Sequence, residues 1–89
     1  MPTLLTRQST VRTDPFRQLY QSSRWHRYSA LFLKKNRLCV YCLSEGRTTV
    51  ARVTDHIIPI TQGGEIWNPS NHQPLCFKHH NQKTKSENK

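Results

Sequence analysis

Three cysteines and a histidine are spaced as two pairs of metal ligands. Cys39 and Cys42 form a C-x2-C pair, and Cys76 and His79 form a C-x2-H pair much further along the chain. Tetrahedral Zn²⁺ takes sulfur and imidazole ligands, and a two-residue gap lets one turn direct both at one ion. The spacing predicts a structural zinc site that joins the ends of a small domain. A redox dithiol and incidental cysteines are the alternatives, and His80 competes with His79 as fourth ligand.

A second group of polar residues has the chemistry to bind a hard cation and to activate water. Asp55 offers a carboxylate oxygen suited to Mg²⁺ or Mn²⁺. His56 has an ordinary pKa of about 6.5, which suits a general base. Asn71 has an amide that can orient a neighbour, and His80 follows a zinc ligand directly. Each of these residues alone is compatible with a turn, a cap or a solvated surface.

The charge of the chain favours a polyanionic partner. Fourteen Lys and Arg against five Asp and Glu give a formal net charge of +9 in 89 residues, which is one domain at most. No apolar run approaches the roughly 18–20 residues that span a bilayer, so a membrane protein is not expected. An odd count of three cysteines fits a metal site in a reducing cytoplasm better than a secreted disulfide framework.

The expected elements place both groups near the middle and end of the chain. Residues 1–21 form a basic segment without sustained periodicity, which predicts a flexible arm. Ser22 or Ser23 is a suitable N-cap for a helix to about Asn36, whose aromatic stripe predicts core packing and whose basic face is either solvated or faces phosphate. The aromatic residues of that stripe are Trp25, Tyr28 and Phe32, and the basic residues are Arg24, Arg27 and Lys34.

The second half of the chain predicts a turn, two extended segments and a helix. Residues 39–46 are expected to form a turn, and residues 50–60 are rich in β-branched residues up to Pro59. A Gly- and Pro-containing loop follows over 61–70, then an extended segment over 72–75 and a polar helix from Phe77. Asp55 and His56 would point to opposite faces of a strand, so a bulge or a strand end is needed to bring them to one site.

The sequence resembles the HNH endonuclease family, in its zinc-knuckle branch from phages and prophages. The resemblance runs from about Trp25 to Glu87 and rests on the blocks C-V-Y-C, V-T-D-H-I-I-P-I-T-Q-G-G and N-P-S-N-H-Q-P-L-C-F-K-H-H-N-Q-K-T. It implies a small α+β fold: a ββα-metal finger with a preceding helix and a structural zinc knuckle. Residues 22–89 would form this nuclease domain and residues 1–21 the arm.

The resemblance also implies a role for each residue of the motif. Asp55 and His80 would hold a catalytic divalent ion, His56 would be the general base, and Asn71 would hold the loop and the base in orientation. Two positions depart from the family pattern: the fourth zinc ligand is His79 where cysteine is usual, and His72 stands where an apolar residue is usual. The four zinc positions correspond to Cys39, Cys42, Cys76 and His79.

The activity implied is hydrolysis of phosphodiester bonds in double-stranded DNA with low sequence specificity. The catalytic ion would be Mg²⁺ or Mn²⁺, with Ni²⁺ and Zn²⁺ left open, and phage terminase or packaging proteins are the partners that the resemblance suggests. The alternative is a non-catalytic zinc-knuckle module that only binds nucleic acid; a redox or protein-interaction module is less favoured. The sequence does not indicate an oligomeric state. The residues expected to contact nucleic acid are Arg24, Arg27, Arg52, Lys83 and Thr84.

Overall fold

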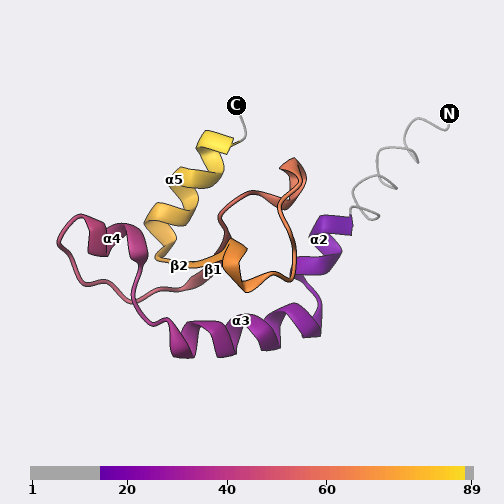
Figure 1. The fold of residues 1–89 in the computed structure, drawn as a ribbon, viewed down its shortest axis with the longest axis horizontal. Helices are drawn as coiled ribbons and strands as arrows, with labels where there is room; N and C mark the ends of the chain where they lie inside the picture. Colours follow the sequence, from indigo (N-terminus) through magenta and orange to yellow (C-terminus); the bar gives the residue numbers. More distant parts are fainter. Residues whose placement is uncertain (1–14, 88–89) are drawn as a thin grey trace, which may run out of the picture.

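The computed structural model describes residues 15–87, and its centre is a two-stranded antiparallel sheet (Figure 1). Strand β1 (Val53–His56) pairs with β2 (His72–Leu75), and Asp55 lies opposite Gln73 in this register. The helices are α2 (Pro15–Tyr20), α3 (Ser23–Lys35), α4 (Val40–Ser44) and α5 (Phe77–Glu87), and two short 3-10 turns are η1 (Ile60–Gln62) and η2 (Pro69–Asn71).

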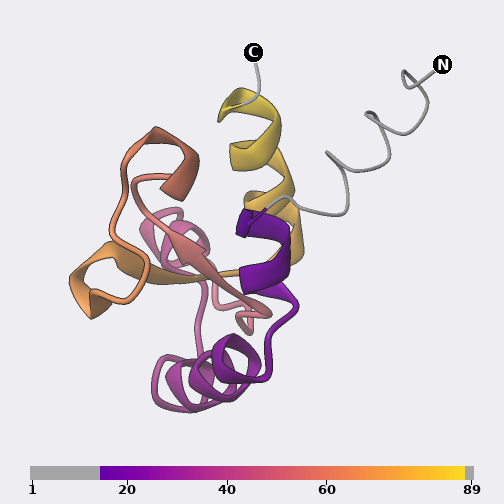
Figure 2. The same ribbon diagram turned by 90° about the vertical axis from the view of Figure 1, so that its right-hand side faces the viewer.

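Helices α3 and α5 lie on opposite sides of the sheet in both views (Figures 1 and 2). Helix α3 packs against β1, whereas α5 packs against both strands and α4 against β2. The expected helix after Ser22 is confirmed, because the Ser22 side chain accepts a hydrogen bond from the Trp25 backbone N–H and caps α3. Trp25 is buried, as its place in the aromatic stripe predicts.

The N-terminal part of the chain differs from the expected arm. Residues 1–14 lie outside the described residues, but residues 15–20, which we expected to be flexible, form helix α2. The reason is a contact that spacing alone does not reveal: the Tyr20 ring packs edge-on against Trp25, with centroids 5.7 Å apart. The Ser22 hydroxyl also donates to the Leu19 carbonyl, which fixes the short link between α2 and α3.

The expected turn over residues 39–46 is instead a short helix. Cys39 caps α4, because its sulfur accepts a hydrogen bond from the Cys42 backbone N–H at 3.5 Å. The prediction of a turn was therefore wrong. The helical turn still brings Cys39 and Cys42 to one side, as the C-x2-C spacing predicts. The predicted extended segment at 72–75 and the helix from Phe77 are confirmed as β2 and α5.

Residues 57–71 form a loop that leaves the sheet after β1 and returns at β2 (Figure 2). A Cβ atom at Gly64 would lie 1.8 Å from the Ile58 carbonyl oxygen, so only glycine fits at this close approach. The loop is therefore packed against its own first residues. Among the described residues, no helix is long and apolar enough to span a membrane.

Candidate active site and metal centre

Four buried side chains converge where α4 meets the start of α5. Cys39 and Cys42 come from the α4 turn, and Cys76 and His79 come from the turn that begins α5. Their ligand atoms all lie within 4.8 Å of one another. The His79 Nδ1 lies 3.3 to 3.6 Å from the three sulfurs, and the Cys42 and Cys76 sulfurs are 3.8 Å apart. A tetrahedral ion with bonds of about 2.3 Å to sulfur requires edges of roughly 3.8 Å, so the cluster fits such an ion.

Within this cluster the protein favours the thiolate form of Cys39, whereas burial raises the pKa of Cys76. Burial raises the pKa of the Cys39 thiol, but hydrogen bonds from Cys42 and Cys76 outweigh that effect and lower the pKa to about 6. A thiolate is the form of cysteine that binds metal. The donor set of three sulfurs and one imidazole nitrogen can therefore hold a structural metal.

Glu45 orients the imidazole of the cluster. The Nε2 of His79 lies 3.3 Å from the Glu45 carboxylate, to which it donates, so the Nδ1 lone pair faces the three sulfurs. Arg47 in turn forms an ion pair with Glu45. Carboxylate partners of this kind fix the tautomer of metal-binding histidines. Sequence reasoning missed Glu45, because nothing in the spacing connects it with His79.

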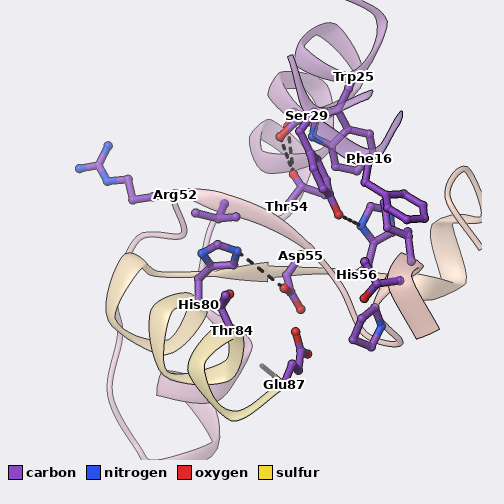
Figure 3. Close-up of a pocket in the computed structure, with 15 residues that line it drawn as sticks. Phe16, Trp25, Ser29, Arg52, Thr54, Asp55, His56, His80, Thr84 and Glu87 are labelled. Carbon is purple, nitrogen blue, oxygen red and sulfur yellow. Dashed lines mark hydrogen bonds and ion pairs between the residues drawn. The ribbon is translucent and has the colours of Figure 1, made fainter. Parts of the chain in front are cut away.

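A cleft of about 470 Å³ lies beside the sheet and contains most of the second group of residues (Figure 3). Asp55, His56 and His80 all line it, and α2 contributes Phe16 and Tyr20. Asp55 and His56 reach one cleft because His56 is the last residue of β1, which is the strand end that the sequence required. The adjacent histidines therefore separate: His79 enters the buried cluster and His80 enters the cleft.

Asp55 and His80 point toward each other across this cleft (Figure 3). The distance from Asp55 Oδ1 to His80 Nε2 is 4.0 Å, which one ion with bonds of about 2.1 Å can bridge. Asp55 is buried, and its Oδ2 accepts hydrogen bonds from Gln73 at 2.9 Å and Lys83 at 3.2 Å. These contacts leave Oδ1 facing His80. The role of Gln73 follows from the strand register and was not visible in the sequence.

His56 is held as a neutral imidazole of defined tautomer. Its Nε2 lies 3.0 Å from the Ile66 carbonyl oxygen, which can only accept, so Nε2 carries the proton. Its Nδ1 then accepts a hydrogen bond from the Tyr20 hydroxyl at 3.0 Å. The ring stacks on Trp25 with centroids 5.0 Å apart. Burial lowers the pKa of His56, and the neighbouring His72 and Lys83 act in the same direction.

Tyr20 remains a donor at neutral pH. Burial, together with the nearby carboxylates of Asp55 and Glu87, raises the pKa of Tyr20 to about 12. The phenol is therefore protonated at neutral pH and can donate to the neutral His56 imidazole. Sequence reasoning missed this contact, because it assigned Tyr20 to the arm.

Asn71 fastens the loop that follows the histidine. Its Oδ1 accepts from the Ile58 backbone N–H at 2.8 Å, and its Nδ2 donates to the carbonyls of Ile58 and Glu65 at 3.1 and 2.9 Å. Asn71 is buried and is not among the residues that line the cleft with His56. Its place in the structure is thus to hold the backbone around the histidine.

His72 repeats the hydrogen-bond pattern of His56 one strand away. Its Nε2 donates to the same Ile66 carbonyl at 2.8 Å, and its Nδ1 accepts from the Tyr28 hydroxyl at 2.6 Å. His72 is buried and lies opposite His56 in the sheet register. The unusual histidine of the sequence is therefore a satisfied core residue that shares an acceptor with His56.

The five residues expected to contact nucleic acid differ in their surroundings. Arg52 and Thr84 both line the cleft, and the Arg52 side chain extends away from Asp55 (Figure 3). Arg24 lies over the Trp67 ring at 3.9 Å, and Arg27 is exposed on α3. Lys83 is engaged with Asp55 and Glu87 rather than extended into solvent. Their contacts with nucleic acid stay a prediction.

Two comparisons with known proteins agree with this geometry. A sequence profile of the HNH endonuclease family matches residues 39–86. The fold is similar to the crystal structure of an HNH endonuclease with manganese ion from the deep-sea thermophilic bacteriophage GVE2, with 33% sequence identity and a TM-score of 0.70. That match covers 93% of this chain and 92% of the phage protein chain. A search of curated protein sequences finds no match.

Two strands and a following helix, with a knuckle of four metal-ligand side chains beside them, define a ββα-metal finger. Its sequence match spans more than half of the chain, and the matched phage structure covers nearly all of it. The chain belongs to the HNH endonuclease family and is an endonuclease, a phosphodiester hydrolase.

Proposed function

We propose that this protein hydrolyses phosphodiester bonds of double-stranded DNA, with His56 as general base and with Asp55 and His80 as ligands of a divalent ion. The observation that carries the proposal is the 4.0 Å separation of Asp55 Oδ1 and His80 Nε2 in the cleft that also holds His56. A base beside a pair of ion ligands is the arrangement that metal-assisted hydrolysis requires.

His56 would take the proton of the attacking water at Nδ1. Its Nε2–H donates to the Ile66 carbonyl, so the carbonyl dipole stabilises the imidazolium that forms in this step. Asn71 holds the backbone around the base by three hydrogen bonds, which keeps the imidazole in place without contact to substrate. Trp25, stacked on the ring, restricts its rotation.

Asp55 and His80 would hold the catalytic ion, and Lys83 and Gln73 would keep Oδ2 of Asp55 turned away from it. When bound, a divalent cation supplies electrostatic stabilisation to the phosphate and to the leaving oxygen. A carboxylate and an imidazole together suit Mn²⁺ or Mg²⁺, with Ni²⁺ and Zn²⁺ as further candidates. The phage relative contains manganese, which supports Mn²⁺ as the first ion to test.

The buried cluster of Cys39, Cys42, Cys76 and His79 would hold a structural Zn²⁺. Sulfur-rich tetrahedral sets favour zinc, and closed sites of four protein ligands are structural rather than catalytic. Three free cysteines require a reducing compartment, which supports the cytoplasm of a host cell as the place of action.

The DNA would be bound mainly through its backbone. A net charge of +9 favours salt-dependent, sequence-independent affinity, to which Arg24, Arg27, Arg52, Lys83 and Thr84 would contribute. The similarity to a phage enzyme supports a role in phage DNA metabolism, and action beside terminase or packaging proteins is the finer hypothesis.

Plasmid nicking tests the proposal. Supercoiled DNA incubated with the protein and Mn²⁺ should be nicked, and His56→Ala should reduce the rate by about 10²–10⁴-fold while DNA binding is retained. His26→Ala is the matched control, since His26 is an exposed histidine of α3. Equal nicking by the His56 variant would refute the role of the base.

A further inference from the structure

The nitrogen of His56 that would receive a proton from water is already occupied. The Ile66 carbonyl accepts from Nε2–H, so the lone pair of the neutral ring lies at Nδ1. The Tyr20 hydroxyl donates to that lone pair at 3.0 Å. His56 Nδ1 cannot accept a proton from a water molecule while it accepts the hydrogen bond of the Tyr20 hydroxyl.

Tyr20 can leave this position without disturbing the sheet. It is the last residue of the six-residue helix α2, which precedes the region matched by the family profile. Its side chain is 39% exposed, and its packing partners in the site are the Trp25 and His56 rings. Trp25 is a buried residue of α3 and stacks on His56, so the ring that supports His56 stays in place when Tyr20 rotates toward solvent.

The Tyr28–His72 pair has the same hydrogen bond in an enclosed position. Tyr28 donates to His72 Nδ1 at 2.6 Å and packs against Trp25, Phe32 and Trp67. His72 does not line the cleft, so its hydrogen bond need not open for catalysis. The two pairs share the Ile66 acceptor and differ in access.

We propose that Tyr20 is a gate over the base: its hydroxyl caps Nδ1 of His56 in the resting enzyme and gives way to the attacking water when DNA and the ion are bound. This inference rests on the proposed role of His56. Tyr20 loses no proton in the step. It exchanges its hydrogen bond to Nδ1 for one to solvent, while the water donates its proton to Nδ1 and its oxygen to phosphorus as the leaving oxygen departs.

Tyr20→Phe tests the gate through the rate of cleavage. The substitution removes the competing donor and keeps the ring, so nicking of supercoiled plasmid at saturating Mn²⁺ should become about two- to tenfold faster, the range that one hydrogen bond supplies. Tyr28→Phe is the matched control and should give no gain. A Tyr20→Phe rate equal to or below that of the parent would overturn the gate, and a lower rate would make Tyr20 a positioning residue.

The ring nitrogens of His56 give a measurement that does not depend on activity. Long-range ¹H–¹⁵N spectra of the folded protein should show a neutral Nε2–H ring, and the Nδ1 resonance should shift in Tyr20→Phe toward that of an unbonded acceptor. In Tyr28→Phe the His72 resonance should shift instead. An unchanged His56 Nδ1 resonance in Tyr20→Phe would refute the contact.

The outcomes for the gate and for the proposed function can be distinguished. A parent protein that cuts no DNA would overturn both the proposed function and the gate. A parent protein that cuts DNA, with a Tyr20→Phe variant that is no faster, would overturn the gate alone.

Discussion

At the residue scale, two histidines with the same hydrogen-bond partners have different positions. His56 and His72 lie opposite each other in the sheet, and both donate to the Ile66 carbonyl. His56 ends its strand and lines the cleft beside Asp55, whereas His72 begins the next strand and is enclosed by aromatic rings. His56 is the candidate base because it lines the cleft, although its hydrogen-bond pattern is the same as that of His72.

The pH dependence of cleavage should report the buried environment of His56. Burial lowers the pKa of His56, with the neighbouring His72 and Lys83 acting in the same direction, while the Ile66 carbonyl and Asp55 oppose them. The His56 ring therefore stays neutral, and able to act as a base, down to a lower pH than the ring of an exposed histidine. At saturating Mn²⁺, kcat/KM should fall on the acid side with an apparent pKa below about 6.5. An acid limb centred above pH 7 would contradict this assignment.

At the scale of elements, the loop of residues 57–71 controls the site. The loop supplies the Ile66 carbonyl that sets the tautomer of His56, and Asn71 fastens its two ends together. Gly64 lets the chain pass the Ile58 carbonyl at close range. A small backbone shift here would move the acceptor on which the imidazole depends, so the loop is part of the site although few of its side chains enter the cleft.

Gly64→Ala should therefore damage both stability and activity. Its Cβ would lie 1.8 Å from the Ile58 carbonyl oxygen, so the backbone must move, and we expect a loss of at least about 2 kcal/mol in the free energy of unfolding. Gly46→Ala is the matched control: Gly46 has φ 81°, but no atom lies within 4 Å of the added Cβ. That change should cost about 1–2 kcal/mol and leave nicking unaltered. Denaturant unfolding and plasmid nicking of both variants measure the difference, and equal effects would contradict the role of the loop.

The sequence predicted the elements better than their contacts. Helix α3, strand β2 and helix α5 were predicted because capping residues and turn residues are local signals. Helix α2 was not, since it depends on Tyr20 reaching Trp25 and His56 across the fold. Glu45 and Gln73 were missed for the same reason: each meets its partner only through the tertiary arrangement.

At the scale of the whole molecule, the Cys3His cluster joins the α4 turn to the start of α5. Cys39 and Leu75 are fully buried, and the core cluster consists of the three cysteines and Leu75, with Tyr41 packed against it. A core cluster this small supplies little apolar burial, so a metal ion held by the Cys3His cluster would contribute much of the folding energy. The cluster also fixes the start of α5, and thereby the direction of His80 toward Asp55.

Variants of the adjacent histidines test the two proposed metal sites separately, because His79 lies in the Cys3His cluster and His80 in the cleft. His79→Ala should lose the bound zinc and the cooperative thermal transition, because a structural ion contributes as much as the whole stability of a small domain. His80→Ala removes only a cleft residue, so it should keep one equivalent of zinc and a cooperative melt while losing nicking. Metal analysis and circular dichroism distinguish them. A His79→Ala protein that melts like the parent would show that the Cys3His cluster does not stabilise the fold.

The most direct test of the central claim is a crystal structure with Mn²⁺ in which anomalous scattering locates the ion. We predict one Mn²⁺ bound by Asp55 Oδ1 and His80 Nε2 at about 2.0–2.3 Å, with His56 beside it but not bound to it. An ion that binds only one of these two residues, or that takes His56 as a ligand, would contradict the shared-ion site and the role of His56 as base.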